Sequence, residues 1–225
     1  MSPGPTDVLR SFGRIRGRSL RAGRASLVDD LLPLVTLDLS RRPLDLKPLK
    51  ADAAETWLEF GFGAGEHLAG QAIAHPEVLL LGAEPFLNGV ASALRHIRDL
   101  DNVRIHPGDG RELLQVLPDA AIDRVFVLFP DPWPKLRHHK RRLINPAFLA
   151  DLARVMKPGA RLRFATDWAD YLGWTLERMD ASGAFDWTAE RADDWRLAPA
   201  DHVATRYQEK RLGDCTPVFL EFRRR

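Results

Sequence analysis

The chain has 225 residues, of which 45% are hydrophobic and 28% charged, a balance that favours an ordinary globular protein over a disordered or fibrous one. The formal net charge is only +2, so any affinity for nucleic acid must come from where the charges lie. The single cysteine, Cys215, excludes an internal disulfide and a multi-cysteine zinc site. Apolar runs fall far short of the ~20 residues of a membrane span, and we expect a cytoplasmic protein without membrane contacts.

The first 24 residues differ in character from the rest of the chain. No acid occurs between Asp7 and Asp29, and six arginines lie within this interval: Arg10, Arg14, Arg16, Arg18, Arg21 and Arg24. The stretch has too few apolar residues to form a core, so it is either a solvated tail or an arm that orders on a phosphate backbone. We expect a flexible basic arm over 1–24, a helix and a linker over 25–50, and the main domain over 51–225.

Strand-like and helix-like stretches alternate along the main domain. The sequence predicts strands at 56–60, 78–83, 103–105, 124–129 and 161–165, and helices at 67–74, 87–100, 111–117, 146–156 and 171–179. Two further strands are expected at 184–187 and 218–222, at the edge of the sheet, the last of them antiparallel. Such alternation is typical of an α/β fold with a mostly parallel, doubly wound sheet.

A glycine-rich turn follows the first predicted strand and precedes a helix, with the sequence Glu59-Phe60-Gly61-Phe62-Gly63-Ala64-Gly65. Glycines permit a sharp turn and let a ligand approach the backbone closely, although a tight turn alone needs no ligand. The spacing differs from the G-x-G-x-x-G of dinucleotide enzymes, which binds a pyrophosphate at the helix N-terminus. An acid before the turn suits an ammonium group, such as that of S-adenosylmethionine, better than an anion.

Two more acids follow the next two predicted strands. Glu84 ends the second strand, at the distance from the turn where a ribose-binding carboxylate is expected, and Asp109 follows the third, where an adenine would lie. A single acid in such a position is often only a helix cap. Three acids at the carboxyl ends of successive strands indicate a nucleoside pocket, because open α/β sheets bind their ligands at that edge.

The fourth predicted strand leads into Phe129-Pro130-Asp131-Pro132-Trp133-Pro134-Lys135. Three prolines in five residues make this loop stiff and hold Asp131 beside the cofactor turn. Asp131 can accept hydrogen bonds from the N–H groups of a guanine, while Trp133 either stacks on a base or packs in the core. A basic run, 135–142, follows directly and is placed to bind phosphates.

These stretches together resemble the bacterial tRNA (guanine-N7-)-methyltransferase family, whose members are class I S-adenosylmethionine-dependent methyltransferases with a Rossmann-like fold. The resemblance extends over nearly the whole chain. The most diagnostic part is the 129–135 loop with the basic run after it. Supporting motifs are the glycine turn with its preceding acid, Ala165-Thr166-Asp167, and Thr205-Arg206-Tyr207-Gln208-Glu209-Lys210.

The resemblance also implies roles for individual residues. Asp131 would be the catalytic residue, and the cofactor would be held by Glu59, Gly61, Gly63, Gly65, Glu84, Asp109 and Asp131. The substrate guanosine would be bound by Lys135, Asp167, Thr205, Arg206, Tyr207, Gln208 and Glu209. The family usually has an acid where this chain has Gln208, so that the acidic role falls either to Gln208, through its carbonyl, or to Glu209.

The implied reaction transfers a methyl group from S-adenosylmethionine to N7 of a guanine in tRNA, at position 46 of the variable loop. Guanine N7 already carries a lone pair, so the reaction needs neither a strong general base nor a metal. The alternatives are another nucleic-acid methyltransferase, acting on adenine N6, and a non-catalytic RNA-binding module. We expect a monomer or a homodimer without an obligate protein partner.

Overall fold

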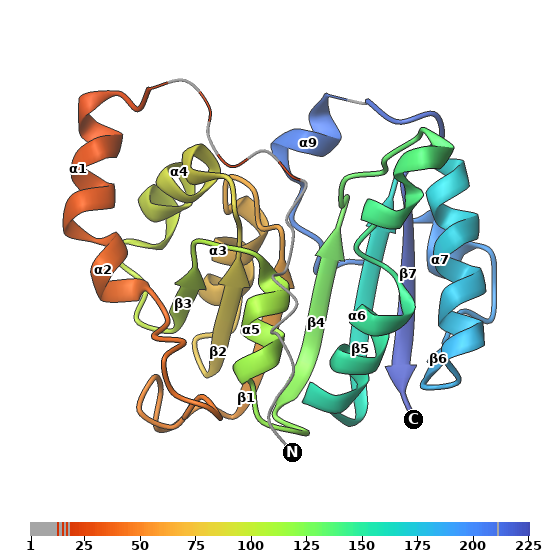
Figure 1. Ribbon diagram of the computed structural model, residues 1–225, viewed down its shortest axis with the longest axis horizontal. Helices are drawn as coiled ribbons and strands as arrows, with labels where there is room; N and C mark the ends of the chain where they lie inside the picture. The colour runs from red at the N-terminus through yellow and green to blue at the C-terminus, as the bar shows by residue number, and fades with distance from the viewer. Residues whose placement is uncertain (1–12, 14, 16, 18, 211) are drawn as a thin grey trace, which may run out of the picture.

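The computed structural model describes residues 13, 15, 17, 19–210 and 212–225, and its centre is a seven-stranded sheet (Figure 1). The strand order is β3-β2-β1-β4-β5-β7-β6. The strands are β1 (Glu55–Phe60), β2 (Val78–Ala83), β3 (Val103–His106), β4 (Ile122–Leu128), β5 (Met156–Thr166), β6 (Phe185–Trp187) and β7 (Val218–Arg224). β1 to β5 pair in parallel, as predicted, which brings their carboxyl ends to one edge of the sheet.

The last two strands complete the sheet beyond β5. β7 is antiparallel to β5, as predicted, and is also antiparallel to β6, which forms the outer edge. β5 begins at Met156, five residues before the predicted start, because Met156 already pairs with Ile122 of β4 before an irregularity in the register, after which the pairing resumes at Arg161. The fold class predicted from the alternation is therefore confirmed.

Helices cover both faces of the sheet (Figure 1). On one face, α3 (Glu66–Ala74) and α4 (Leu87–Ile97) pack on a hydrophobic cluster that contains Trp57, Leu80 and Phe126. On the other face, α5 (Gly110–Val116), α6 (Pro146–Val155) and α7 (Ala169–Ser182) pack on a second cluster with Leu58 and Val125. Neighbouring residues of one strand enter opposite clusters because side chains alternate across a strand.

The segment before β1 packs onto this domain. The helix predicted in the 25–50 segment is present as two helices, α1 (Ala22–Asp30) and α2 (Leu32–Val35), and α1 lies along α4 (Figure 1). The linker runs without helix or strand over 38–50, but Leu44 is buried and its N–H donates to the carbonyl of Val116. Most of the predicted arm, with Arg10, Arg14, Arg16 and Arg18, lies outside the described residues.

Three short helices were not predicted from the sequence: the 3-10 helix η1 (Leu136–Arg141), α8 (Asp193–Arg196) and α9 (Arg206–Glu209). Each is too short to show a hydrophobic period, which is why the pattern does not reveal it. η1 and α9 both lie at the carboxyl edge of the sheet (Figure 1). Among the described residues, no helix has both the length and the apolar character needed to cross a membrane.

Candidate active site

The carboxyl edge of the sheet carries a row of acidic side chains. The predicted acids are the penultimate residue of β1 and four residues just beyond the ends of β2 to β5: Glu59, Glu84, Asp109, Asp131 and Asp167. The strand order β3-β2-β1-β4-β5 places them in the spatial order Asp109, Glu84, Glu59, Asp131, Asp167. The topology thus brings together, at one edge, residues that lie up to about a hundred positions apart in the sequence.

The glycine turn after β1 leaves open space on one side. Gly61, Gly63 and Gly65 all have positive φ, at 69°, 56° and 86°, a conformation that residues with a Cβ adopt only with strain. Apart from the adjoining residues, no atom of the described part of the chain lies within 4 Å of where a Cβ of Gly61 or Gly63 would be, whereas a Cβ on Gly65 would lie 2.5 Å from the Cβ of Ala93. Gly65 therefore lets α3 pack against α4, and the first two glycines leave room for a ligand.

Glu84 connects this turn to the start of α4 through hydrogen bonds. Its carboxylate accepts hydrogen bonds from the backbone N–H groups of Gly63, at 2.9 Å, and of Phe86, at 2.8 Å. Burial raises the pKa of the Glu84 carboxyl, the two backbone hydrogen bonds lower it, and the charges of Asp131 and Glu59 raise it again, with a net increase. No cation of the described residues contributes to the pKa of Glu84, and a cationic ligand beside the carboxylate would favour its ionised form.

The loop after β4 holds Asp131 under backbone strain. Phe129 and Trp133, on either side of it, have φ of 51° and 45°, although neither is a glycine. Strain of this kind costs on the order of 1–3 kcal/mol per residue and is found mainly at functional sites. Asp131 is open to solvent on one side, yet the protein around it removes enough water to raise the pKa of its carboxyl. Its side chain makes no hydrogen bond to the described residues.

Trp133 does not belong to the hydrophobic core. It is half-buried, with the guanidinium of Arg141 4.9 Å from its ring centroid and the ring of His138 5.8 Å away. The basic run that follows is likewise not a uniform phosphate-binding surface. Arg142 is buried, donates to the carbonyl of Pro132 and pairs with Asp170, so it stabilises the loop from inside. The expectation that the whole run faces phosphates is wrong for this residue, whose polar partners lie within the protein.

Glu59 contacts the protein interior. It is 3% exposed, and its carboxylate lies 2.8 Å from Nδ1 of His67 on α3. His67 is fully buried, with Gln71 3.4 Å from its other ring nitrogen, and Gln71 donates to the carbonyl of Asp201. The acid before the glycine turn therefore connects the turn to residues of the C-terminal region.

The carboxylate of Asp109 already has a partner within the protein, Arg111. It caps α5 by accepting from the backbone N–H of Arg111, and it pairs with the Arg111 guanidinium at 2.6 Å. Burial raises the pKa of the Asp109 carboxyl, but the hydrogen bonds and charge of Arg111 outweigh burial, so the net shift is downward. The structure thus confirms the helix-cap role of Asp109, while its contact with an adenine stays a prediction.

Two of the predicted substrate residues, Asp167 and Tyr207, lie close together, and Asp167 is buried directly after β5. Its carboxylate accepts from the backbone N–H of Gly213, at 3.0 Å, and lies 3.4 Å from the hydroxyl of Tyr207. The ring of Tyr207 lies 5.6 Å from that of Phe129, at the start of the proline loop. Arg206 pairs with Glu66, the first residue of α3, so α9 lies against both the proline loop and the helix that follows the glycine turn. Lys135 is exposed next to the loop.

Gln208 and Glu209 have different surroundings. The Gln208 carbonyl accepts from the backbone N–H of Thr205 in a capping box that starts α9, and it lies 2.7 Å from Nε2 of His202. Glu209 is exposed. The glutamine therefore occupies the inward-facing position, where its oxygen serves as an acceptor without the charge of an acid.

The capping box leads to a prediction for Gln208. Gln208→Glu keeps the acceptor for Thr205 and His202 and should retain activity within about threefold, whereas Gln208→Leu removes it and costs about 1 kcal/mol at the helix start. We expect the leucine variant to lose roughly fivefold in kcat/KM for tRNA, because about 1.4 kcal/mol corresponds to a factor of ten in rate. Steady-state methylation kinetics measure both. Equal rates for the glutamate and leucine variants would show that the acceptor is unimportant.

Three residues near the predicted site were not predicted from the sequence: His67, His202 and Arg163. Arg163 is buried in β5 and pairs with Asp201 and Glu221, and His202 packs near His67 with ring centroids 5.7 Å apart. Burial lowers the pKa of His202, and the hydrogen bond with Gln208 only partly opposes this. No local motif marks these contacts, since their partners lie far away in the sequence. Within the described part of the chain, no group of three or more His, Cys, Asp or Glu side chains could hold a metal.

Comparison with known proteins identifies the family of this chain. The model of a family described as "Putative methyltransferase" matches residues 53–218. The tRNA (guanine-N(7)-)-methyltransferase of Caulobacter vibrioides is 57% identical, with 98% of this chain and 97% of the relative covered. The enzyme of the same name from Hyphomonas neptunium is 49% identical, with 96% and 99% covered.

Solved structures agree on the fold. A 16S rRNA (adenine(1408)-N(1))-methyltransferase from Catenulisporales acidiphilia gives a TM-score of 0.54 at 22% identity, with 84% of this chain and 96% of that chain covered. An antibiotic-related methyltransferase gives 0.54 at 15% identity, with 83% and 96% covered. The fold and family predicted from the sequence are both confirmed: the chain belongs to the tRNA (guanine-N7-)-methyltransferase family and is an S-adenosylmethionine-dependent methyltransferase.

Proposed function

We propose that this enzyme methylates N7 of a guanine in tRNA, at position 46 of the variable loop, in the cytoplasm. The observation that carries the proposal is the strained loop of Asp131 beside the open glycine turn, in a chain whose relatives carry that activity by name. The loop supplies an acceptor for the Watson–Crick edge of a guanine, and the turn supplies space for a methyl donor.

The residues at the turn suit S-adenosylmethionine. The cofactor is a cation with an ammonium and a sulfonium group, and Glu84 and Asp131 are carboxyls with raised pKa values that form no ion pair with any described residue. The space next to Gly61 and Gly63, which a Cβ would fill, allows close approach to the backbone. Glu84 and Asp109 would hold the ribose and the adenine edge, and the bound cofactor would supply an electrophilic methyl group.

The protein's part in the reaction is mainly positioning. Guanine N7 needs no deprotonation, so no residue is assigned as a general base. Asp131 would accept hydrogen bonds from the N–H groups of the guanine and balance the positive charge that develops on the purine. Asp167 and Tyr207, on the other side of the proline loop, would hold the flipped nucleotide. Holding N7 in line with the methyl carbon is worth up to ~7–11 kcal/mol of the barrier.

The proposal is tested with the purified protein, S-adenosylmethionine carrying a labelled methyl group, and an unmodified tRNA transcript. We expect the label to enter the tRNA and to appear as 7-methylguanosine after digestion. A transcript with adenosine in place of the guanosine at position 46 should not accept the label. Label in N6-methyladenosine would instead favour an adenine enzyme, and cofactor binding without transfer would favour a non-catalytic RNA-binding module.

A further inference from the structure

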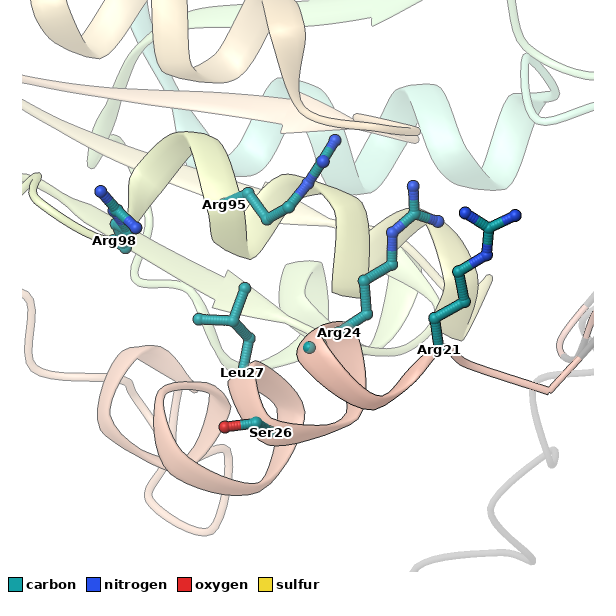
Figure 2. Close-up of a pocket in the computed structure, with 7 residues that line it drawn as sticks. Arg21, Arg24, Ser26, Leu27, Arg95 and Arg98 are labelled. Atoms are coloured by element: carbon teal, nitrogen blue, oxygen red, sulfur yellow. The ribbon is translucent and has the colours of Figure 1, made fainter.

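A cleft lined by four arginines lies between α1 and α4, away from the row of acids (Figure 2). Arg21 and Arg24 come from the start of α1, and Arg95 and Arg98 from the end of α4. Within each pair the residues are three positions apart, so both side chains lie on one side of their helix. Figure 2 shows that Arg21, Arg24 and Arg95 extend in the same direction, whereas Arg98 stands apart.

Little negative charge offsets these arginines. Arg98 pairs with Asp99, but Arg21, Arg24 and Arg95 form no ion pair with any residue that the structure describes. Arg21 and Arg95 are exposed and Arg24 is half-buried, so none of them serves a core function. Like charges brought together without a partner repel one another, and the arrangement therefore favours an external anion.

The helix α4 extends from the cofactor turn to the cleft. The start of α4 meets the cofactor turn, since a Cβ on Gly89 would lie 2.6 Å from the carbonyl oxygen of Gly63. Arg95 lies six residues further along the helix, which corresponds to about 9 Å at a rise of 1.5 Å per residue.

Two described residues of the N-terminal segment lie at the active site and at the start of α4. A Cβ on Gly13 would lie 3.8 Å from a carboxylate oxygen of Asp131, and the N–H of Gly17 donates to Asn88 at the start of α4. The segment then leads into α1. A polyanion bound with one nucleotide at Asp131 thus has a route along α4 to the arginines.

We propose that the α1–α4 arginine cleft is a second contact surface for the sugar–phosphate backbone of the tRNA, outside the pocket of the methylated base. The proposal rests on the proposed function, because it takes tRNA as the substrate. Arginine is suited to the task since its planar guanidinium donates two parallel hydrogen bonds to a phosphate. Such contacts position the RNA and strengthen binding, but carry no sequence information themselves.

The test compares two charge-matched double variants. Arg24→Gln/Arg95→Gln removes two charges from the cleft. Arg161→Gln/Arg223→Gln removes two exposed arginines from the far half of β5 and β7, where they are neighbours in register. Binding of an unmodified tRNA transcript is measured for both and for the wild type at several salt concentrations, together with S-adenosylmethionine binding and kcat at saturating tRNA.

We expect the cleft variant to bind tRNA roughly tenfold more weakly and its salt slope to fall by about 2, or about 1 per lost phosphate contact. Cofactor affinity and kcat should stay within about twofold of wild type, and the control variant should behave as wild type. Equal tRNA affinities and slopes for the two double variants would overturn the proposal, as would loss of binding to anionic lipid vesicles without loss of tRNA binding. Failure of the wild type to methylate tRNA would instead contradict the proposed function.

Discussion

Asp131→Asn should reduce the methylation rate at saturating tRNA at least a hundredfold, while the protein remains folded. Asparagine has the size of aspartate but lacks the charge that we assign to balancing the methylated purine. Removing one preorganised electrostatic group from an active site typically costs ~10²–10³ in kcat. Asp131→Ala should have a larger effect, since it also removes the acceptor for the base. Single-turnover transfer of a labelled methyl group measures both variants.

The fold should tolerate the change at Asp131. Its carboxylate makes no hydrogen bond to the described residues, and burial raises its pKa, so a neutral side chain there should not lower the melting temperature. Asp180→Asn is a matched control, because Asp180 is exposed on α7 and lies outside the row of acids. If Asp131→Asn kept a rate within a few-fold of this control, the catalytic role would belong to another residue.

Gly63→Ala should weaken S-adenosylmethionine binding at least tenfold. The added methyl group meets no atom of the described, non-adjoining residues within 4 Å, so it would extend into the space that we assign to the cofactor. Backbone strain contributes separately, since Gly63 has φ of 56° and a non-glycine residue in this conformation costs about 1–2 kcal/mol. Isothermal titration with the cofactor, compared with thermal unfolding of the free protein, separates the two effects.

Gly183→Ala provides the control for strain. Gly183 ends α7 with φ of 62°, and a Cβ there would likewise have no atom of the non-adjoining residues that the structure describes within 4 Å. Both alanine variants should therefore lose similar stability, about 2–4 °C in melting temperature per kcal/mol for a chain of this size. Only Gly63→Ala should lose cofactor affinity. Equal cofactor affinity in the two variants would mean that the open side of the turn is not the cofactor site.

Much of the fold followed from local patterns. The alternation of strands and helices predicts a parallel sheet, and in such a sheet the carboxyl ends of successive strands meet at one edge. This topology predicts that Glu84 and Asp131 lie at the same edge, and the charge of Asp131 contributes to raising the pKa of Glu84. The glycine turn was visible because positive φ strongly favours one residue type.

Other properties depend on packing between segments that are distant in the sequence. Arg142 belongs to a basic run, yet it is buried against Tyr171 and Trp174 while its neighbour Lys140 is exposed. Residue type and position in the run do not distinguish the two, because burial is decided by the helix that packs on them.

The sequence by itself thus determined the fold class, the family, and the edge of the sheet at which the predicted acids lie. These follow from periodicity, glycine spacing and the proline loop, which are local features of the sequence that restrict the backbone conformation directly. Only the tertiary structure decided which charges face solvent and which face one another. The connection of Glu59 to the C-terminal region through His67, and the arginine cleft between α1 and α4, arise from that packing.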